Sequence, residues 1–113
     1  MRRDLERVQD MLDCLNNIDR YAVRGEGAFF EDELIQTWIL HHLQILGEAA
    51  RAMSSGFQAR YPGLDWRGVI GFRNLAVHEY FRVDLVIVWR IVVSELPLVR
   101  SQVEMMLRCE DED

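Results

Sequence analysis

The stretch Leu85-Val86-Ile87-Val88-Trp89-Arg90-Ile91-Val92-Val93 decides between a helical fold and one that contains a sheet. Its β-branched residues favour a strand by propensity. No other part of the chain offers a partner strand, and an unpaired strand cannot satisfy its backbone hydrogen bonds. We therefore predict a helix over residues 83–93, with Asp84 as its N-cap.

Elsewhere in the sequence, apolar residues recur every three or four positions and predict the other helices. The predicted helices cover residues 4–24, 31–53, 66–81 and 97–108, with one further helical turn at 57–60. Gly25-Glu26-Gly27 is expected to end the first helix, Asp65 to cap the third, and Pro97 to start or kink the last. The sequence thus predicts an all-α fold, an antiparallel bundle of four to five helices.

The length of 113 residues predicts a single helical domain over residues 1–109, followed by a solvated acidic tail at 110–113. The helix at 83–93 is apolar on nearly all sides, so it must be covered on two of them. A chain of this size can cover only one side of that helix with its own residues. We therefore expect a symmetric homodimer.

Composition excludes several classes of protein. All 13 basic residues are arginines, which excludes Schiff-base chemistry and a P-loop, since both need a lysine. No run approaches the roughly 18 apolar residues of a membrane helix, and the amino terminus lacks the apolar run of a signal peptide. Cys14 and Cys109 are too few and too far apart for a disulfide framework or a zinc site. A reduced, cytoplasmic protein without a membrane partner is expected.

The net charge of −6 argues against a general nucleic-acid binder, whose surface is usually basic. The charge is unevenly distributed, however. Residues 51–90 hold six arginines against three acidic residues, a net of +3, whereas the remainder carries −9. Either a local basic region serves an anionic ligand, or the difference is ordinary variation over forty residues.

That basic region contains Arg73-Asn74-Leu75-Ala76-Val77-His78-Glu79-Tyr80. Arg73 has a fork of donors that matches two phosphate oxygens. His78 can accept and return a proton near neutral pH. Asn74 can orient His78 or donate to a phosphate, and Tyr80 offers a hydroxyl that can accept a transferred group. These residue types fit the handling of a phosphodiester.

On one straight α-helix Arg73 and His78, five residues apart, would point roughly 140° away from each other. Either the helix loosens before His78, or a second copy completes the site across a dimer axis. A symmetric dimer would bring two arginines and two histidines to one cleft, with one His as base and the other as acid.

The spelling R-N-x-x-x-H-x-Y resembles the signature of the HEPN superfamily, in its HepT-like branch of toxin ribonucleases. Further stretches look like the same branch in the same order. They are Met1-Arg2-Arg3-Asp4-Leu5, Leu43-Gln44-Ile45-Leu46-Gly47-Glu48-Ala49-Ala50, Tyr61-Pro62-Gly63-Leu64-Asp65-Trp66-Arg67 and Tyr80-Phe81-Arg82-Val83-Asp84-Leu85. The similarity therefore spans nearly the whole chain.

The resemblance implies the toxin of a toxin–antitoxin pair, an endoribonuclease with Arg73 and His78 as catalytic residues. It also implies a cognate MntA-type nucleotidyltransferase antitoxin that transfers AMP from ATP to Tyr80. The mechanism we infer needs neither metal nor cofactor: His78 deprotonates a ribose 2′-OH while Arg73 holds the phosphate of the RNA.

Structural readings of the same residues remain open. Arg73 could pair with Glu48, His78 could cap the helix end, and Tyr80 could pack on Phe81. The alternative function is a non-catalytic helical module that binds a nucleotide or a partner protein. A metal site at His41 and His42 is disfavoured, because adjacent residues diverge by ~100° on a helix.

Overall fold

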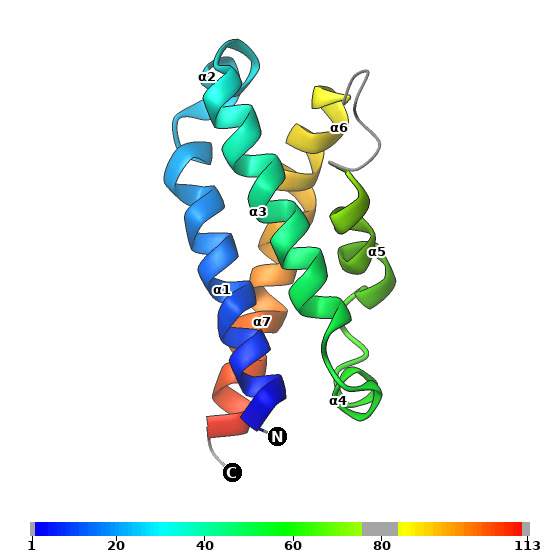
Figure 1. The fold of residues 1–113 in the computed structure, drawn as a ribbon. Helices are drawn as coiled ribbons and strands as arrows, with labels where there is room; N and C mark the ends of the chain where they lie inside the picture. Colours follow the sequence, from blue (N-terminus) through cyan, green and yellow to red (C-terminus); the bar gives the residue numbers. More distant parts are fainter. Residues whose placement is uncertain (1, 76–83, 112–113) are drawn as a thin grey trace.

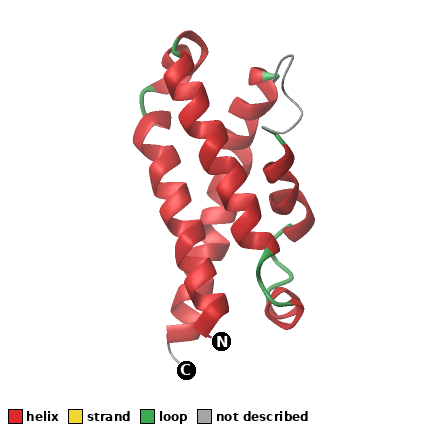
Figure 2. Cartoon of the chain, viewed as in Figure 1, coloured by secondary structure: helices red, strands yellow, loops and turns green. Residues whose placement is uncertain are grey.

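The computed structural model describes residues 2–75 and 84–111, and throughout these residues the regular structure is helical (Figure 2). Its elements in chain order are α1 (Arg2–Ala22), α2 (Gly25–Glu31), α3 (Glu33–Arg51), α4 (Ser55–Arg60), α5 (Trp66–Gly71), the 3₁₀ helix η1 (Phe72–Asn74), α6 (Leu85–Arg90), the π-helix η2 (Ile91–Glu95) and α7 (Leu96–Asp111). The predicted all-α class is confirmed, and so is the helix at the stretch 85–93.

The long helices run antiparallel along one axis (Figure 1). From the end that holds both termini, α1 rises, α3 returns, α5 rises again beside α3, and α6 leads down into α7. Fully buried apolar side chains from α1, α3 and α7 meet in the centre. Among them are Val8, Met11, Ile18, Ile39, Leu43, Leu46, Val103 and Met106. Helix α3 therefore has α1 on one side and the α5–η1 segment on the other.

The connection after the first helix differs from the predicted one. Instead of reaching Arg24 and ending in a glycine loop, α1 ends at Ala22, and Gly25 begins α2. Gly25 takes φ +93°, a conformation that glycine adopts without the strain of a Cβ. This single reversal lets α2 form, and Asp32 then caps α3 by accepting from the backbone N–H of Leu34 at 2.9 Å.

Pro97 is the second residue of the last helix, α7, which confirms the prediction that it lies at the start of that helix. Helices α6, η2 and α7 nevertheless follow one another without a gap. A proline inside a helix removes one backbone bond and crowds the carbonyl four residues before it. The wider π-helix η2 (Ile91–Glu95) includes Val93, the residue four positions before Pro97, where that crowding would fall.

Two polar clusters close the end of the bundle near the termini. The buried carboxylate of Asp4 accepts from the backbone N–H of Ser54 at 2.8 Å and from its hydroxyl at 2.7 Å. Glu110, expected in a solvated tail, lies in α7 with a side chain only 10% exposed. It pairs with Arg60 and accepts from the hydroxyl of Tyr61 at 2.5 Å.

Candidate functional site

Arg73 and Asn74 of the predicted site lie in η1, directly after the short helix α5. The predicted cap of that helix is confirmed, because the Asp65 carboxylate accepts from the backbone N–H of Gly68 at 3.1 Å. Buried Val69 and Phe72 pack the segment into the core. Arg73 is consequently carried on an anchored backbone with its side chain at the surface, and Asn74 is exposed.

The expected continuous α-helix over 66–81 is wrong, because α5 ends at Gly71 and the chain tightens into a 3₁₀ turn closed by a bond from the Leu75 N–H to the Phe72 carbonyl. Two glycines in a six-residue helix weaken it, which explains the early end. The chain does depart from α-helical geometry before His78, by tightening rather than by loosening. His78 and Tyr80 themselves lie outside the described residues.

Gly47 of α3 makes room for this segment. A Cβ at Gly47 would lie 2.7 Å from the backbone nitrogen of Arg73 and 3.0 Å from the carbonyl oxygens of Val69 and Ile70. Real Cβ atoms do not approach other atoms so closely, so only glycine fits at this crossing. Gly47 therefore allows α3 to approach this segment closely, and this contact sets the position of the Arg73 backbone.

The residue after Gly47 meets the Arg73 side chain. An oxygen of Glu48 lies 3.6 Å from the Arg73 Nη1 and 3.9 Å from the Arg51 Nη1. The Arg73 side chain is 35% exposed and that of Glu48 is 51% exposed. Arg73 therefore forms the ion pair with Glu48 that was considered from the sequence, and both side chains remain accessible to solvent.

An exposed ion pair of this kind contributes only about 0–1 kcal/mol to stability. A phosphate, by contrast, can take two parallel charge-assisted hydrogen bonds from one guanidinium. The arrangement thus allows an incoming phosphodiester to displace Glu48 from Arg73.

The adjacent histidines of α3 do not form a metal site. The His42 ring is buried, and its Nδ1 donates to the Trp38 carbonyl oxygen at 2.8 Å, so His42 is a structural residue. His41 is exposed. Across residues 2–75 and 84–111 the structure has no group of three His, Cys, Asp or Glu side chains that could hold a metal ion.

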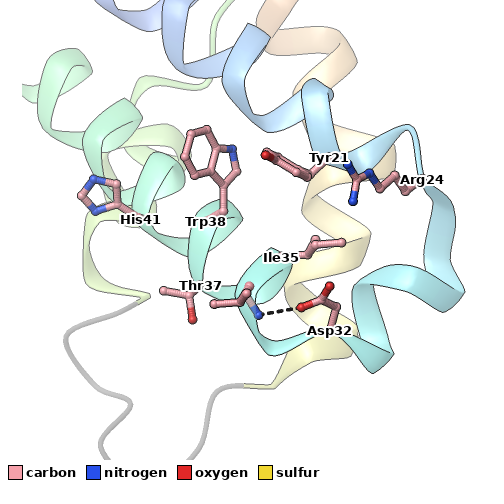
Figure 3. Close-up of a pocket in the computed structure, with 8 residues that line it drawn as sticks. Tyr21, Arg24, Asp32, Ile35, Thr37, Trp38 and His41 are labelled. Atoms are coloured by element: carbon pink, nitrogen blue, oxygen red, sulfur yellow. Dashed lines mark hydrogen bonds between the residues drawn. The ribbon is translucent and has the colours of Figure 1, made fainter.

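Sequence reasoning missed a cavity of about 430 Å³ between the end of α1 and the first half of α3 (Figure 3). Tyr21 and Trp38 form one wall, and Arg24, Asp32, Thr37 and His41 surround the opening. Leu34, Trp38 and His41 are spaced by four and three residues, which places them on one helix face. That spacing was the available signal in the sequence.

Within the part of the chain that the structure describes, no helix combines the length and the apolarity that crossing a membrane requires.

Comparison with known proteins finds one family and several relatives that match most of the chain. The family described as "Ribonuclease HepT-like" matches residues 11–106, a range that includes the whole motif at 73–80. A provisionally named RNase, MJ1380 of Methanocaldococcus jannaschii, is 28% identical over 90% of this chain and 88% of its own. The "Probable ribonuclease HepT" of Thermococcus cleftensis is 28% identical over 88% of this chain and 89% of its own.

A third relative, the provisionally named RNase TTE0752 of Caldanaerobacter subterraneus, is 29% identical over 87% of this chain and 88% of its own. No solved structure matches the chain significantly. The family match covers far more than half of the residues, and the relatives are covered almost end to end. The chain belongs to the HepT-like ribonuclease family.

Proposed function

We propose that this protein is the toxin of a toxin–antitoxin pair and cleaves RNA without a metal ion. The observation that carries the proposal is the placement of Arg73. Its backbone is wedged against Gly47, while its guanidinium stays partly exposed beside a weak, displaceable partner. A purely structural arginine would gain more from a buried, fully hydrogen-bonded partner.

The reaction follows from the residue types of the motif. Arg73 binds the scissile phosphate and offsets the charge that develops on it. His78 removes the proton of the adjacent ribose 2′-OH, which attacks phosphorus, and the product carries a 2′,3′-cyclic phosphate. Asn74 orients His78 or donates to the phosphate. DNA lacks the 2′-OH and is spared.

The direct test is RNA cleavage by purified protein in EDTA. Wild type should cleave, and His78→Ala should lose cleavage by roughly 10²–10⁴-fold while its helicity, measured by circular dichroism, stays unchanged. His78→Ala activity close to that of wild type would remove the acid–base role. It would favour the alternative, a module that binds a nucleotide or partner protein without catalysis, for which the Arg73–Glu48 pair is the supporting observation.

We also propose a homodimer that brings two copies of the motif together. The segment from α6 to α7 leaves four apolar side chains exposed, Val86, Ile87, Val93 and Leu98. Such a set of exposed apolar side chains is typical of an interface. Light scattering should report a dimer at micromolar concentration, and a stable monomer would contradict both the dimer and the composite site.

We further propose that a cognate nucleotidyltransferase antitoxin of the MntA type adenylylates Tyr80. An AMP joined there would add a negative phosphodiester to the motif, seven residues after the phosphate-binding Arg73 in the sequence, and compete with RNA. Intact-mass measurement after incubation with the transferase, ATP and Mg²⁺ should show added AMP on wild type but not on Tyr80→Phe. Equal labelling of both, or full RNA cleavage by the labelled protein, would exclude this switch.

A further inference from the structure

The cavity beside α3 has a preformed aromatic wall. The rings of Tyr21 and Trp38 lie 5.2 Å apart at an interplanar angle of 66°. The indole Nε1 of Trp38 donates to the Asn17 carbonyl oxygen at 2.7 Å, and the ring centres of Trp38 and His42 lie 4.4 Å apart. The wall is therefore held in place by the protein's own contacts, so a flat ligand would find it already ordered.

Two arginine side chains lie over the aromatic rings of this wall. The Arg24 guanidinium lies 4.8 Å from the Tyr21 ring centre, and the Arg20 guanidinium lies 5.9 Å from the Trp38 ring centre. Aromatic rings combined with arginines form the surface that single-stranded nucleic acid requires, since the rings stack on bases while the cations meet the backbone.

The opposite rim carries hydrogen-bonding groups. Asp32 accepts one bond from the backbone N–H of Leu34, and a carboxylate has lone pairs for further donors such as the N–H groups of a base. Thr37 and His41 also line the cavity (Figure 3). A volume of about 430 Å³ falls within the range of small-molecule pockets.

The cavity is joined to Arg73 along one face of α3. Trp38, His41, Ile45 and Glu48 follow one another at spacings of three and four residues, so they form one stripe. His41, Ile45 and Glu48 are exposed, and Glu48 contacts Arg73. Glu48 is ten positions after Trp38, which corresponds to about 15 Å along the helix at ~1.5 Å per residue, a length that a few nucleotides of single strand can cover.

We propose that this cavity is a base-binding subsite for single-stranded RNA, a few nucleotides away from the phosphate held by Arg73. The inference rests on the proposed function and extends it to the substrate. One unpaired base stacks on the wall of Tyr21 and Trp38 and bonds to Asp32 or Thr37, and Arg24 meets the neighbouring phosphate. The substrate is accordingly a single-stranded segment, because a base inside a duplex cannot enter the cavity.

The test is binding of two fluorescent 2′-O-methyl oligoribonucleotides, which cannot be cleaved at the methylated sugars, measured by anisotropy. One is a dinucleotide and the other has about ten nucleotides, within the usual site size of single-strand binders. Tyr21→Leu should weaken binding of the longer probe by about tenfold, as loss of one base-stacking contact does, and leave the dinucleotide unaffected. Tyr21→Phe keeps the ring and should bind as wild type.

Arg24→Gln should weaken the longer probe and reduce the salt dependence of its binding, because one phosphate contact is lost. Arg7→Gln removes the same charge near the other end of α1 and serves as the matched control with unchanged binding. Arg73→Ala should weaken both probes. If Arg73 does not bind a phosphate, Arg73→Ala should bind both probes as wild type does, whatever the result for the cavity variants.

Wild-type affinity of a folded Tyr21→Leu variant for the longer probe would overturn the subsite. So would an equal loss on both probes, which would indicate a general structural effect. A shift of the Tyr21→Leu variant to a smaller assembly in light scattering, with RNA binding intact, would likewise overturn it and assign the cavity to a contact between protein chains.

Discussion

Two arginine–glutamate pairs of this protein differ most in the burial of the glutamate, since the arginine side chains are 51% exposed in Arg60 and 35% exposed in Arg73. Glu110 is 10% exposed, pairs with Arg60 and accepts from the Tyr61 hydroxyl at 2.5 Å. Glu48 is 51% exposed and lies 3.6 Å from Arg73. The first pair joins the α4 end to α7, and the second lies on the surface of α3.

The difference indicates which pair stabilises the fold and which serves a ligand. Removing one partner of a buried, hydrogen-bonded group leaves the other unsatisfied, at a cost of roughly 1–3 kcal/mol. An exposed pair contributes about 0–1 kcal/mol. We therefore interpret Arg60–Glu110–Tyr61 as a structural clasp and Arg73–Glu48 as a resting contact that substrate phosphate replaces.

The largest effect is expected at the backbone that carries Arg73. Gly47→Ala places a Cβ 2.7 Å from the Arg73 nitrogen, so η1 must move away from α3. Overpacking of this kind should lower the free energy of unfolding by about 2–3 kcal/mol, measured by urea denaturation, and RNA cleavage should fall with it. Gly71→Ala is the matched control, since nothing lies within 4 Å of its added Cβ. Equal stability of Gly47→Ala and Gly71→Ala would contradict the close contact between Gly47 and the Arg73 backbone.

A smaller loss is expected when the clasp is broken. Glu110→Gln removes the charge that Arg60 and the Tyr61 hydroxyl both meet, and it should lower the free energy of unfolding by about 1–2 kcal/mol. Glu104→Gln is the control, because Glu104 is exposed and only 3.7 Å from Arg100 within the same helix. Glu110→Gln as stable as Glu104→Gln would mean that the clasp contributes no more than a surface pair.

The clasp should also give the protein an alkaline stability limit. Burial, together with the hydrogen bond to Glu110 and the charge of that carboxylate, raises the pKa of Tyr61 from 10.0 to about 12. The unfolded chain releases this proton near pH 10 and the folded chain does not, so the contribution of Tyr61 to stability is lost as the pH rises from 10 to 12. Thermal melts over this interval should fall more steeply for wild type than for Tyr61→Phe. Parallel curves would contradict the assignment.

The comparison of the two pairs also shows what the sequence could predict. Helical periodicity located α1, α3 and the stretch 85–93, because apolar spacing reports burial directly. It failed at Gly25, where one backbone reversal starts α2, and at Gly71, where α5 ends and η1 begins. Such endings depend on the backbone conformation of single glycines, which the spacing of apolar residues does not report.

The candidate site could likewise be predicted only in part. Arg73 and Asn74 were recognised by residue type and by resemblance to a family, and Glu48 was anticipated as a structural partner of Arg73. The partners of Glu110 were not anticipated, since Tyr61 and Glu110 are 49 residues apart. The aromatic cavity was missed because Tyr21 and Trp38 come from different helices, and their meeting is a property of the folded chain.

The smallest effect on stability is expected at Glu48. Glu48→Gln should change the free energy of unfolding by less than about 1 kcal/mol, because the pair is exposed on both sides. RNA should bind more tightly to this variant, since a negative charge beside the phosphate site is removed. Titration with an uncleavable RNA measures this directly. Weaker binding would mean that Glu48 positions Arg73 rather than competing with RNA.

The most direct test of the account is the rate of RNA cleavage by Arg73→Ala in EDTA, compared with wild type under the same conditions. If Arg73 holds the scissile phosphate, the rate should fall by roughly 10²–10³-fold, as when one donor to developing charge is removed. The stability of the variant should change by no more than that of an exposed pair, about 0–1 kcal/mol. A folded Arg73→Ala protein that cleaves RNA at nearly the wild-type rate would contradict the account.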